Sequence, residues 1–247
     1  MRLIFCYFLF YATALFGDAF DDLVTAYEKY GGDKYMICEE IIQTSHVLQA
    51  AYIANEAGAP ENIVIGLLFH DIGQVAIKEN VGNIEVLHRY HDDIGEEWLE
   101  ERGFPEKVCK LVKFHTLAKV VLCMEDEEYF EHLSLASKES YYYQRDKYLN
   151  EPGQLSLDRF NALPYREDIL TSRKCDDMAK IAGMDPDHFI AYKEMIERVI
   201  RGKGKPAQNP EWRETVNALH REMCRDRSSF EEMMKNRIKS PRNLPHL

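Results

Sequence analysis

The adjacent residues His70 and Asp71 constrain this chain more than any other feature. They end an apolar run in the segment LLFHDIG of residues 67–73. An apolar run is buried on folding, and a histidine followed at once by an aspartate can direct two different ligand atoms at one buried metal ion. A His-Asp pair alone is common. Here, however, further residues of the same chemistry lie at helical spacings around it: His46, His91, His115 and, far downstream, Asp176.

These six residues supply four imidazoles and two carboxylates, enough for two metal ions that share a bridging carboxylate. Asp71 could bridge the ions, and Asp176 could complete the second site. Imidazole and carboxylate suit iron, manganese or zinc, and the lack of thiolate ligands argues against a structural zinc site. A single histidine on a helix is usually a packing or surface residue, and we assign that ordinary role to the remaining ones: His88, His132, His188, His220 and His246.

Most of the chain has the apolar periodicity of helices, without convincing strand alternation. Glycine and proline residues mark where the predicted helices end or begin. The segments expected to be helical are 20–30, 39–57, 60–73, 91–102, a stretch that begins at 105 and contains His115, 128–143, 168–182 and 186–200. We therefore predict an all-α helical bundle with a di-metal site in its core.

The 247 residues suit one generous domain with extensions. We predict a catalytic core over residues 18–200, followed by a linker and C-terminal tail over 201–247. Residues 1–17 form an apolar N-terminal extension or a signal-like segment, since one positive charge precedes an uncharged apolar stretch that ends in small residues. That stretch is too short for a comfortable transmembrane helix, and no other stretch could form a stable membrane span.

The charge balance limits the partners. A formal net charge of -11 argues against a nucleic-acid partner. It does not exclude a small anionic substrate, because a metal site carries its own positive field. The six cysteines show no disulfide framework, so we expect free thiols in a reducing compartment.

The order H…HD…H…H…D resembles the HD-domain superfamily. Within it, the chain is most similar to the mixed-valent di-iron oxygenases of the phosphonate-cleaving branch, over about residues 20–198. The motifs that carry the resemblance are Glu39-x-x-x-Gln43-x-x-His46, Leu68-Phe69-His70-Asp71-Ile72-Gly73, His91-Asp92-Asp93-Ile94-Gly95, His115-Thr116-Leu117-Ala118-Lys119, Leu133-Ser134-Leu135-Ala136-Ser137 and Arg173-x-x-Asp176.

The resemblance implies an HD-domain fold and two iron ions that cycle as Fe(II)/Fe(III), with O2 as co-substrate. It implies cleavage of the C–P bond of a 1-hydroxyphosphonate, such as 2-amino-1-hydroxyethylphosphonate, to phosphate and a carboxylic acid, here glycine. The implied catalytic metal ligands are His46, His70, Asp71, His91, His115 and Asp176. The implied substrate contacts are Glu39, Lys119, Ser137, Ser140, Arg173, Gln74 and Tyr35.

Two positions depart from the family pattern. Gln74 stands where the family often has a histidine, so it can donate a hydrogen bond to an oxyanion but carries no charge. Tyr35 is displaced by one residue from the position of the family's lid tyrosine. Glu39 favours a primary ammonium on the substrate, whereas a trimethylammonium would prefer aromatic faces such as those of residues 141–143.

The sequence is also compatible with non-functional roles for these residues and with other functions. Lys119 could be a surface lysine, Arg173 could pair with Asp177 alone, and the two serines could be plain helix residues. A binuclear HD-type phosphohydrolase of a nucleotide or phosphate ester would use the same six ligands. An inositol-oxygenase-like polyol oxygenase and a non-catalytic metal-binding module are further alternatives. Iron chemistry and free cysteines favour the cytoplasm, against the signal-like N-terminus, and the sequence leaves the oligomeric state unknown.

Overall fold

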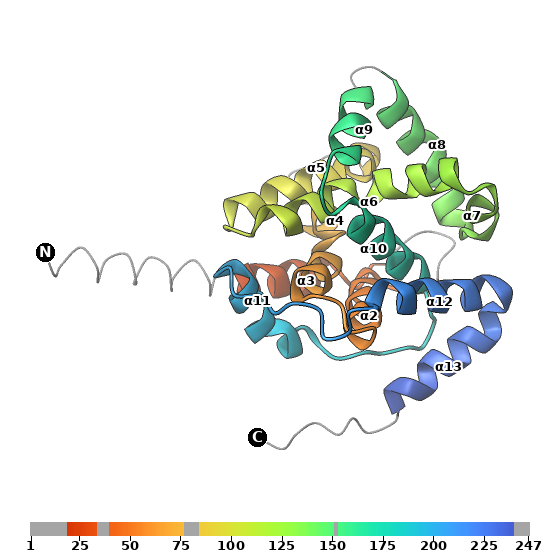
Figure 1. Cartoon of the computed structure of the whole chain (residues 1–247). Helices are drawn as coiled ribbons and strands as arrows, with labels where there is room; N and C mark the ends of the chain where they lie inside the picture. The colour runs from red at the N-terminus through yellow and green to blue at the C-terminus, as the bar shows by residue number, and fades with distance from the viewer. Residues whose placement is uncertain (1–18, 34–39, 77–83, 151–152, 240–247) are drawn as a thin grey trace, which may run out of the picture.

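The computed structural model describes residues 19–33, 40–76, 84–150 and 153–239, with the backbone alone at residues 84–88. This part of the chain is a bundle of helices without a β-strand, which confirms the all-α class (Figure 1). After a helix over 19–30, the elements are α2 (Gln43–Glu56), α3 (Glu61–Phe69), α4 (Ile72–Val75), α5 (Ile84–Glu101), α6 (Glu106–Glu125), α7 (Glu127–His132), α8 (Leu135–Leu149), α9 (Gly153–Asn161), α10 (Arg166–Met178), a 3-10 turn η1 (Phe189–Tyr192), α11 (Lys193–Ile200), α12 (Trp212–Arg225) and α13 (Arg227–Lys239).

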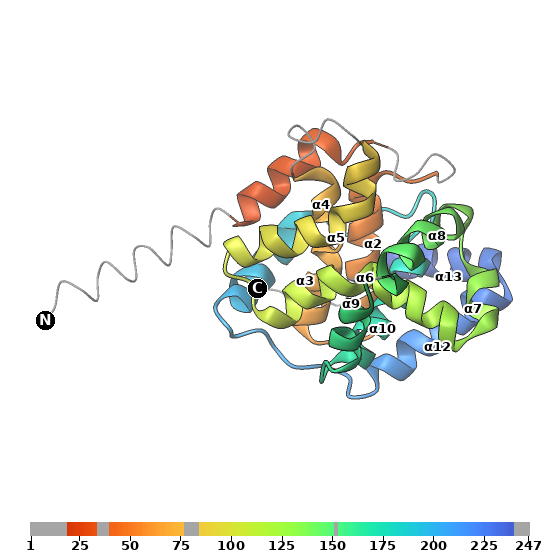
Figure 2. The same cartoon turned by 90° about the horizontal axis from the view of Figure 1, so that it is seen from above.

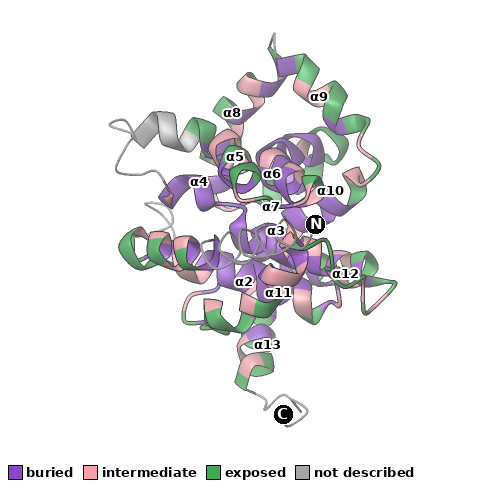
Figure 3. Cartoon of the chain, turned by 90° about the vertical axis from the view of Figure 1, so that its left-hand side faces the viewer, coloured by how far each residue is buried: buried purple, intermediate pink, exposed green. Residues whose placement is uncertain are grey.

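Helix α6 runs through the middle of the bundle and packs against α3, α5, α8 and α10, while α2 packs against α3 and α10 (Figure 2). Helix α3 is apolar on all sides, as expected of a helix that is buried on all sides. Most residues of α2, α3, α4 and α6 are buried, as the purple colour of these helices in Figure 3 shows. The helices that carry or flank His46, the His70-Asp71 pair and His115 therefore form the centre of the hydrophobic core.

The His70-Asp71 pair lies where α3 ends and α4 begins. Asp71 leaves the helical conformation, with φ -103° and ψ 13°, so the predicted helix over 60–73 is in fact two helices. Gly73 then lets α4 lie directly on α5, because a Cβ atom at this position would overlap the carbonyl oxygen of His91. This close approach brings Asp71 and His91 to the same side of the core.

Several predicted helix boundaries were wrong. The helix predicted to begin at residue 39 begins at Gln43. The single helix predicted over 128–143 is two helices, because Ser134 starts a new one by accepting a hydrogen bond from the backbone N–H of Ser137. The helices predicted over 91–102 and 168–182 span Ile84–Glu101 and Arg166–Met178.

The segment predicted over 186–200 also differs, because a 3-10 turn over Phe189–Tyr192 comes before the short helix α11. Beyond it, residues 201–239 contribute to the same core. Helix α12 packs on α10, and its Trp212 is only 3% exposed. The division of the chain into domains near residue 200 stays a prediction.

Two further observations bear on the sequence predictions. The cysteines in the described ranges are free thiols: Cys109, Cys123, Cys175 and Cys224. Within those ranges, no helix combines the length and the apolar character needed to cross a membrane.

Candidate active site

The six predicted metal ligands converge in the centre of the bundle as two groups. His46, His70 and Asp176 form one group, and Asp71, His91 and His115 form the other. Within each group the ligand atoms lie within 4.8 Å of one another, and all six side chains are buried. The ligands come from α2, the α3–α4 junction, α5, α6 and α10.

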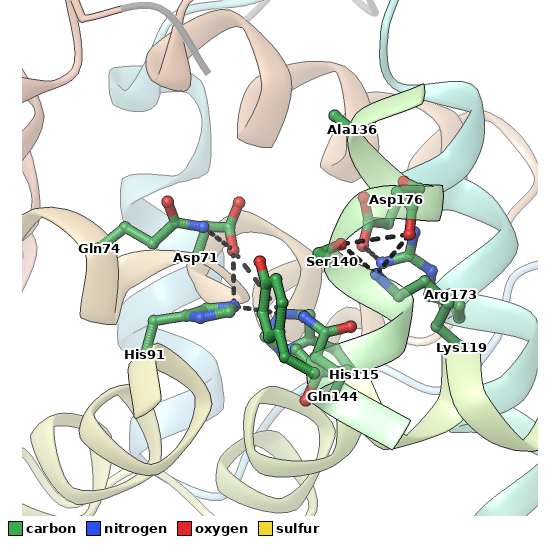
Figure 4. A pocket seen from close by; sticks show the side chains of 13 residues that line it. Asp71, Gln74, His91, His115, Lys119, Ala136, Ser140, Gln144, Arg173 and Asp176 are labelled. Carbon is green, nitrogen blue, oxygen red and sulfur yellow. Dashed lines mark hydrogen bonds and ion pairs between the residues drawn. The ribbon is translucent and has the colours of Figure 1, made fainter. Parts of the chain in front are cut away.

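Asp71 lies between the two groups and offers one carboxylate oxygen to each. Its Oδ2 atom is 3.7 Å from His46 Nε2 and 3.6 Å from His70 Nε2. Its Oδ1 atom is 3.4 Å from His91 Nε2 and 3.6 Å from His115 Nε2 (Figure 4). The Oδ2 atom is buried and accepts no hydrogen bond. This is the geometry of a carboxylate that bridges two cations.

Backbone carbonyls orient the imidazole rings. The Nδ1 atoms of His46, His70 and His115 lie 2.8, 2.6 and 2.6 Å from the carbonyl oxygens of Ala179, Leu67 and Val112. A neutral ring that donates from Nδ1 presents a bare lone pair at Nε2, the form that binds a metal. The same device therefore prepares three of the four rings for coordination.

The distances between rings fit a metal ion. His46 Nε2 and His70 Nε2 are 3.0 Å apart, as are His91 Nε2 and His115 Nε2. Two nitrogens that bind one ion at about 2.1 Å and at right angles lie about 3.0 Å apart. Each pair of rings is therefore spaced as two ligands of a single ion would be, and Asp176 Oδ1 lies 3.2 Å from His46 Nε2 as a third ligand atom of that group. The residues present therefore fit a di-metal centre.

The charges in the site are also suited to a metal. Burial lowers the pKa of His70 to about 4, so its ring is neutral near pH 7. Burial alone would raise the pKa of Asp176, but the guanidinium of Arg173 and the nearby imidazoles hold it well below its usual value. Arg173 donates to both Asp176 and Asp177. The interpretation that Arg173 pairs with Asp177 alone was therefore wrong.

A small cavity of about 40 Å³ adjoins the metal groups. Asp71, His91, His115 and Asp176 line one part of its wall. Apart from Ala136, the other lining side chains are polar: Gln74, Thr116, Lys119, Ser137, Ser140, Tyr143, Gln144 and Arg173. In Figure 4, Asp71 and His91 lie across this cavity from Lys119 and Arg173. A bound ligand would thus contact cationic side chains and metal ligands at the same time.

Lys119 is 2% exposed, so the surface interpretation of this residue was wrong. Its Nζ donates to Ser140 Oγ at 2.6 Å and to the carbonyl oxygen of Ser137 at 3.2 Å. Burial, and then the charges of Arg173 and Lys180, hold the pKa of Lys119 well below its ordinary value. An anion in the cavity would relieve this repulsion.

The other predicted substrate contacts have different outcomes. Gln74 lines the cavity, but its Nε2 donates to Asp71 Oδ1 at 2.8 Å, and it accepts from Gln43 Nε2 at 3.0 Å. Gln74 thereby holds the bridging carboxylate in place. Glu39 and Tyr35 lie outside the described residues.

Sequence reasoning missed several buried polar residues around the site. Asp92 accepts hydrogen bonds from Thr116 Oγ1 at 2.6 Å, from Lys147 Nζ at 2.7 Å and from Tyr148. This network joins α5, α6 and α8 next to His91. The only signal in the sequence was the position of Asp92 directly after a predicted ligand.

Two more of the missed residues belong to or contact the turn after α10: Lys180 lies in the turn, and Gln49 on α2 binds it. Gln49 binds both the N–H and the carbonyl of Ile181, at 3.0 and 2.9 Å, and Lys180 Nζ donates to Ser137 Oγ at 2.7 Å. Lys180 is four positions after Asp176, and that spacing was the available signal.

Residues 44–152 match the HD domain family. A 1-hydroxy-2-(trimethylamino)ethylphosphonate dioxygenase (glycine-betaine-forming) of Leisingera caerulea is 32% identical over 170 residues, 68% of this chain and 84% of that protein. A hydroxymethylphosphonate dioxygenase of Gimesia maris is 29% identical over 168 residues, 66% of this chain and 79% of that protein. An uncharacterised protein of Acanthamoeba polyphaga mimivirus is 29% identical over 178 residues, 70% of this chain and 78% of that protein.

Proposed function

Because this chain belongs to the HD-domain phosphonate-cleaving oxygenases, we propose that it uses two iron ions and O2 to cleave the C–P bond of a small 1-hydroxyphosphonate. The overall reaction converts RCH(OH)PO3H2 and O2 into RCOOH and H3PO4. With 2-amino-1-hydroxyethylphosphonate, the carboxylic acid would be glycine.

The observation that carries the proposal is that one cavity contains both halves of the chemistry. Four metal-ligand side chains line it together with the buried cations Lys119 and Arg173. Iron held by the two groups would supply the oxygen activation and redox capacity that no amino-acid side chain has. A neutral polyol would not offset the repulsion of Lys119 by Arg173 and Lys180, so the cavity favours an anionic substrate over an inositol-like one.

The side chains of the cavity have distinct roles in this proposal. Lys119 and Arg173 bind phosphonate oxygens by charge-assisted hydrogen bonds, and the hydroxyls of Ser137 and Ser140 orient the group. Gln74 keeps the Asp71 carboxylate turned toward both metal groups. The small volume of the cavity excludes bulk water from the reacting carbon.

Oxygen consumption and phosphate release test the proposal. The anaerobically iron-loaded protein is assayed with hydroxymethylphosphonate, 2-amino-1-hydroxyethylphosphonate and 1-hydroxy-2-(trimethylamino)ethylphosphonate, under air and under argon. We expect one phosphate per O2 consumed with at least one of them, and no phosphate under argon. Equal phosphate release without oxygen would instead identify a binuclear phosphohydrolase.

A pair of variants makes the test specific to the cavity. Lys119→Met removes a buried charge that we expect to bind the phosphonate, so kcat/KM falls at least a hundredfold. Lys138→Met is the matched control, because Lys138 lies on the outside of α8 and pairs with Glu131. Equal activity of the two variants would refute the role assigned to Lys119.

A further inference from the structure

Lys180 is a third cation beside the cavity. It is 5% exposed, and its Nζ donates to Ser134 Oγ at 3.0 Å and to Ser137 Oγ at 2.7 Å. These hydroxyls belong to the N-cap and first turn of α8, where the helix dipole disfavours a positive charge. Burying a lysine at a helix N-terminus is costly. The contact of Lys180 with Ser137 links it to the cavity, because Ser137 lines the cavity.

The hydroxyl of Ser137 has a constrained hydrogen-bonding pattern. A serine hydroxyl has one donor hydrogen and two acceptor lone pairs. Lys180 Nζ and an Arg173 guanidinium nitrogen both donate to Ser137 Oγ, at 2.7 and 3.5 Å. Since the closest contact of the oxygen is with a cationic donor, Lys180 Nζ, the hydroxyl hydrogen is directed away from it. Ser137 lines the cavity, so that hydrogen is available to an acceptor inside it.

We propose that Lys180 is a positioning residue that turns the Ser137 hydroxyl into a hydrogen-bond donor for a phosphonate oxygen. This inference rests on the proposed function and deepens it, because it adds a residue to the anion-binding part of the same site. Lys180 does not line the cavity and acts through Ser137.

Two side chains of α2, His46 and Gln49, hold the turn that carries Lys180. The carbonyl of Ala179, one residue before it, lies 2.8 Å from His46 Nδ1. Ile181, one residue after it, has both its N–H and its carbonyl bound by the buried side chain of Gln49. Lys180 therefore has a defined position relative to a metal ligand, and so has the Ser137 hydroxyl that it contacts.

A double-mutant cycle tests the proposal. Wild type, Lys180→Met, Ser137→Ala and the double variant are loaded with Fe(II) under argon, and their affinity for methylphosphonate is measured by calorimetry. We expect each single substitution to weaken binding about tenfold, the contribution of one charge-assisted hydrogen bond. We also expect the factor by which Lys180→Met weakens binding to be at least threefold smaller in the Ser137→Ala background than in wild type. In that background Lys180 has no hydroxyl to orient.

If the double variant loses affinity by the product of the two single losses, the substitutions are independent. This result would overturn the proposal, since Lys180 would then act without Ser137. Wild-type affinity in Ser137→Ala would overturn it too, and this variant keeps the proposal falsifiable if Lys180→Met fails to fold. In steady-state assays Lys180→Met should raise KM, whereas a lower kcat at unchanged KM would contradict a role in phosphonate binding. Lys138→Met again serves as the surface control.

The cycle is distinguishable from the test of the proposed function. If wild type binds methylphosphonate and shows the expected coupling but consumes no O2 with any hydroxyphosphonate, the oxygenase function fails while the role of Lys180 stands. If O2 is consumed and the cycle shows no coupling, the function stands and the role of Lys180 fails.

Discussion

Replacing the bridging carboxylate by its neutral amide, Asp71→Asn, should separate metal binding from folding. The substitution preserves the volume of the side chain and the oxygen that accepts from Gln74 Nε2 at 2.8 Å. It removes the charge that faces both groups of imidazoles, 3.4 Å from His91 Nε2 and 3.6 Å from His70 Nε2. The protein should therefore fold but bind at most one ion in place of two.

The expected change in stability follows from metal binding to the folded state alone. At a free metal concentration a hundredfold above the dissociation constant, each bound ion stabilises the fold by about 2.7 kcal/mol. For a chain of this length, about 1 kcal/mol corresponds to a change in Tm of about 2–4 °C. Each ion should thus raise Tm by about 5–11 °C. We expect two such increments in wild type and no more than one in Asp71→Asn.

The assay combines metal analysis with thermal unfolding, with and without a chelator, on protein loaded anaerobically with Fe(II). The matched control is Asp93→Asn, since Asp93 is partly exposed in the middle of α5, where it pairs with Lys147 and Lys113 and is not one of the grouped ligands. The control should retain two ions per chain. Two ions and a full wild-type increase of Tm in Asp71→Asn would refute the bridging role of Asp71.

Three further substitutions test other parts of the structure. Gln49→Leu leaves the N–H and carbonyl of Ile181 without partners, so the free energy of unfolding should fall by about 2–4 kcal/mol; an unchanged urea midpoint would contradict this. Trp212→Ala should cost about 3–5 kcal/mol in the same measurement, because the side chain is buried in the core, whereas a loose tail would lose almost nothing. Burial lowers the pKa of His220 to about 4 in the folded chain, below its ordinary 6.5. The unfolded chain therefore binds more protons between these values, and stability is fully present above pH 6.5 and falls toward pH 4. His220→Gln should make this loss shallower in chelator-treated protein; an identical slope would refute the assignment.

The metal ligands could be predicted from the sequence because each residue type carries its chemistry wherever it lies. Four histidines and two aspartates at helical spacings needed only a shared core to meet, and a helix as apolar as α3 ensures that core. The resemblance to a known family added Lys119, Ser137, Ser140 and Arg173, which all line the cavity. Their identity as substrate contacts stays a prediction.

The residues and helix boundaries that the sequence did not predict depend on backbone geometry. Lys180 and Gln49 act through the turn after α10, whose conformation has no periodicity, so the spacing of Lys180 from Asp176 alone does not give their contacts. The break between α7 and α8 depends on the conformation of Ser134, a residue that is equally compatible with a continuous helix. Trp212 lies on an amphipathic stripe that is also typical of a surface helix, and only its packing on the bundle shows that it is buried.

The metal site and the hydrophobic core make opposite demands on this fold. Four imidazoles and two carboxylates occupy the centre of the bundle, where burial disfavours charge and the Nε2 atoms of His46 and His70 lie only 3.0 Å apart. The apolar side chains of α2, α3 and α6 must hold this arrangement together before any metal binds. Because the fold holds the ligand atoms of each group within 4.8 Å of one another, part of the metal affinity comes from the folding of the surrounding helices. It follows that substitutions which relax the core around α3 should weaken metal binding even when they contact no ligand.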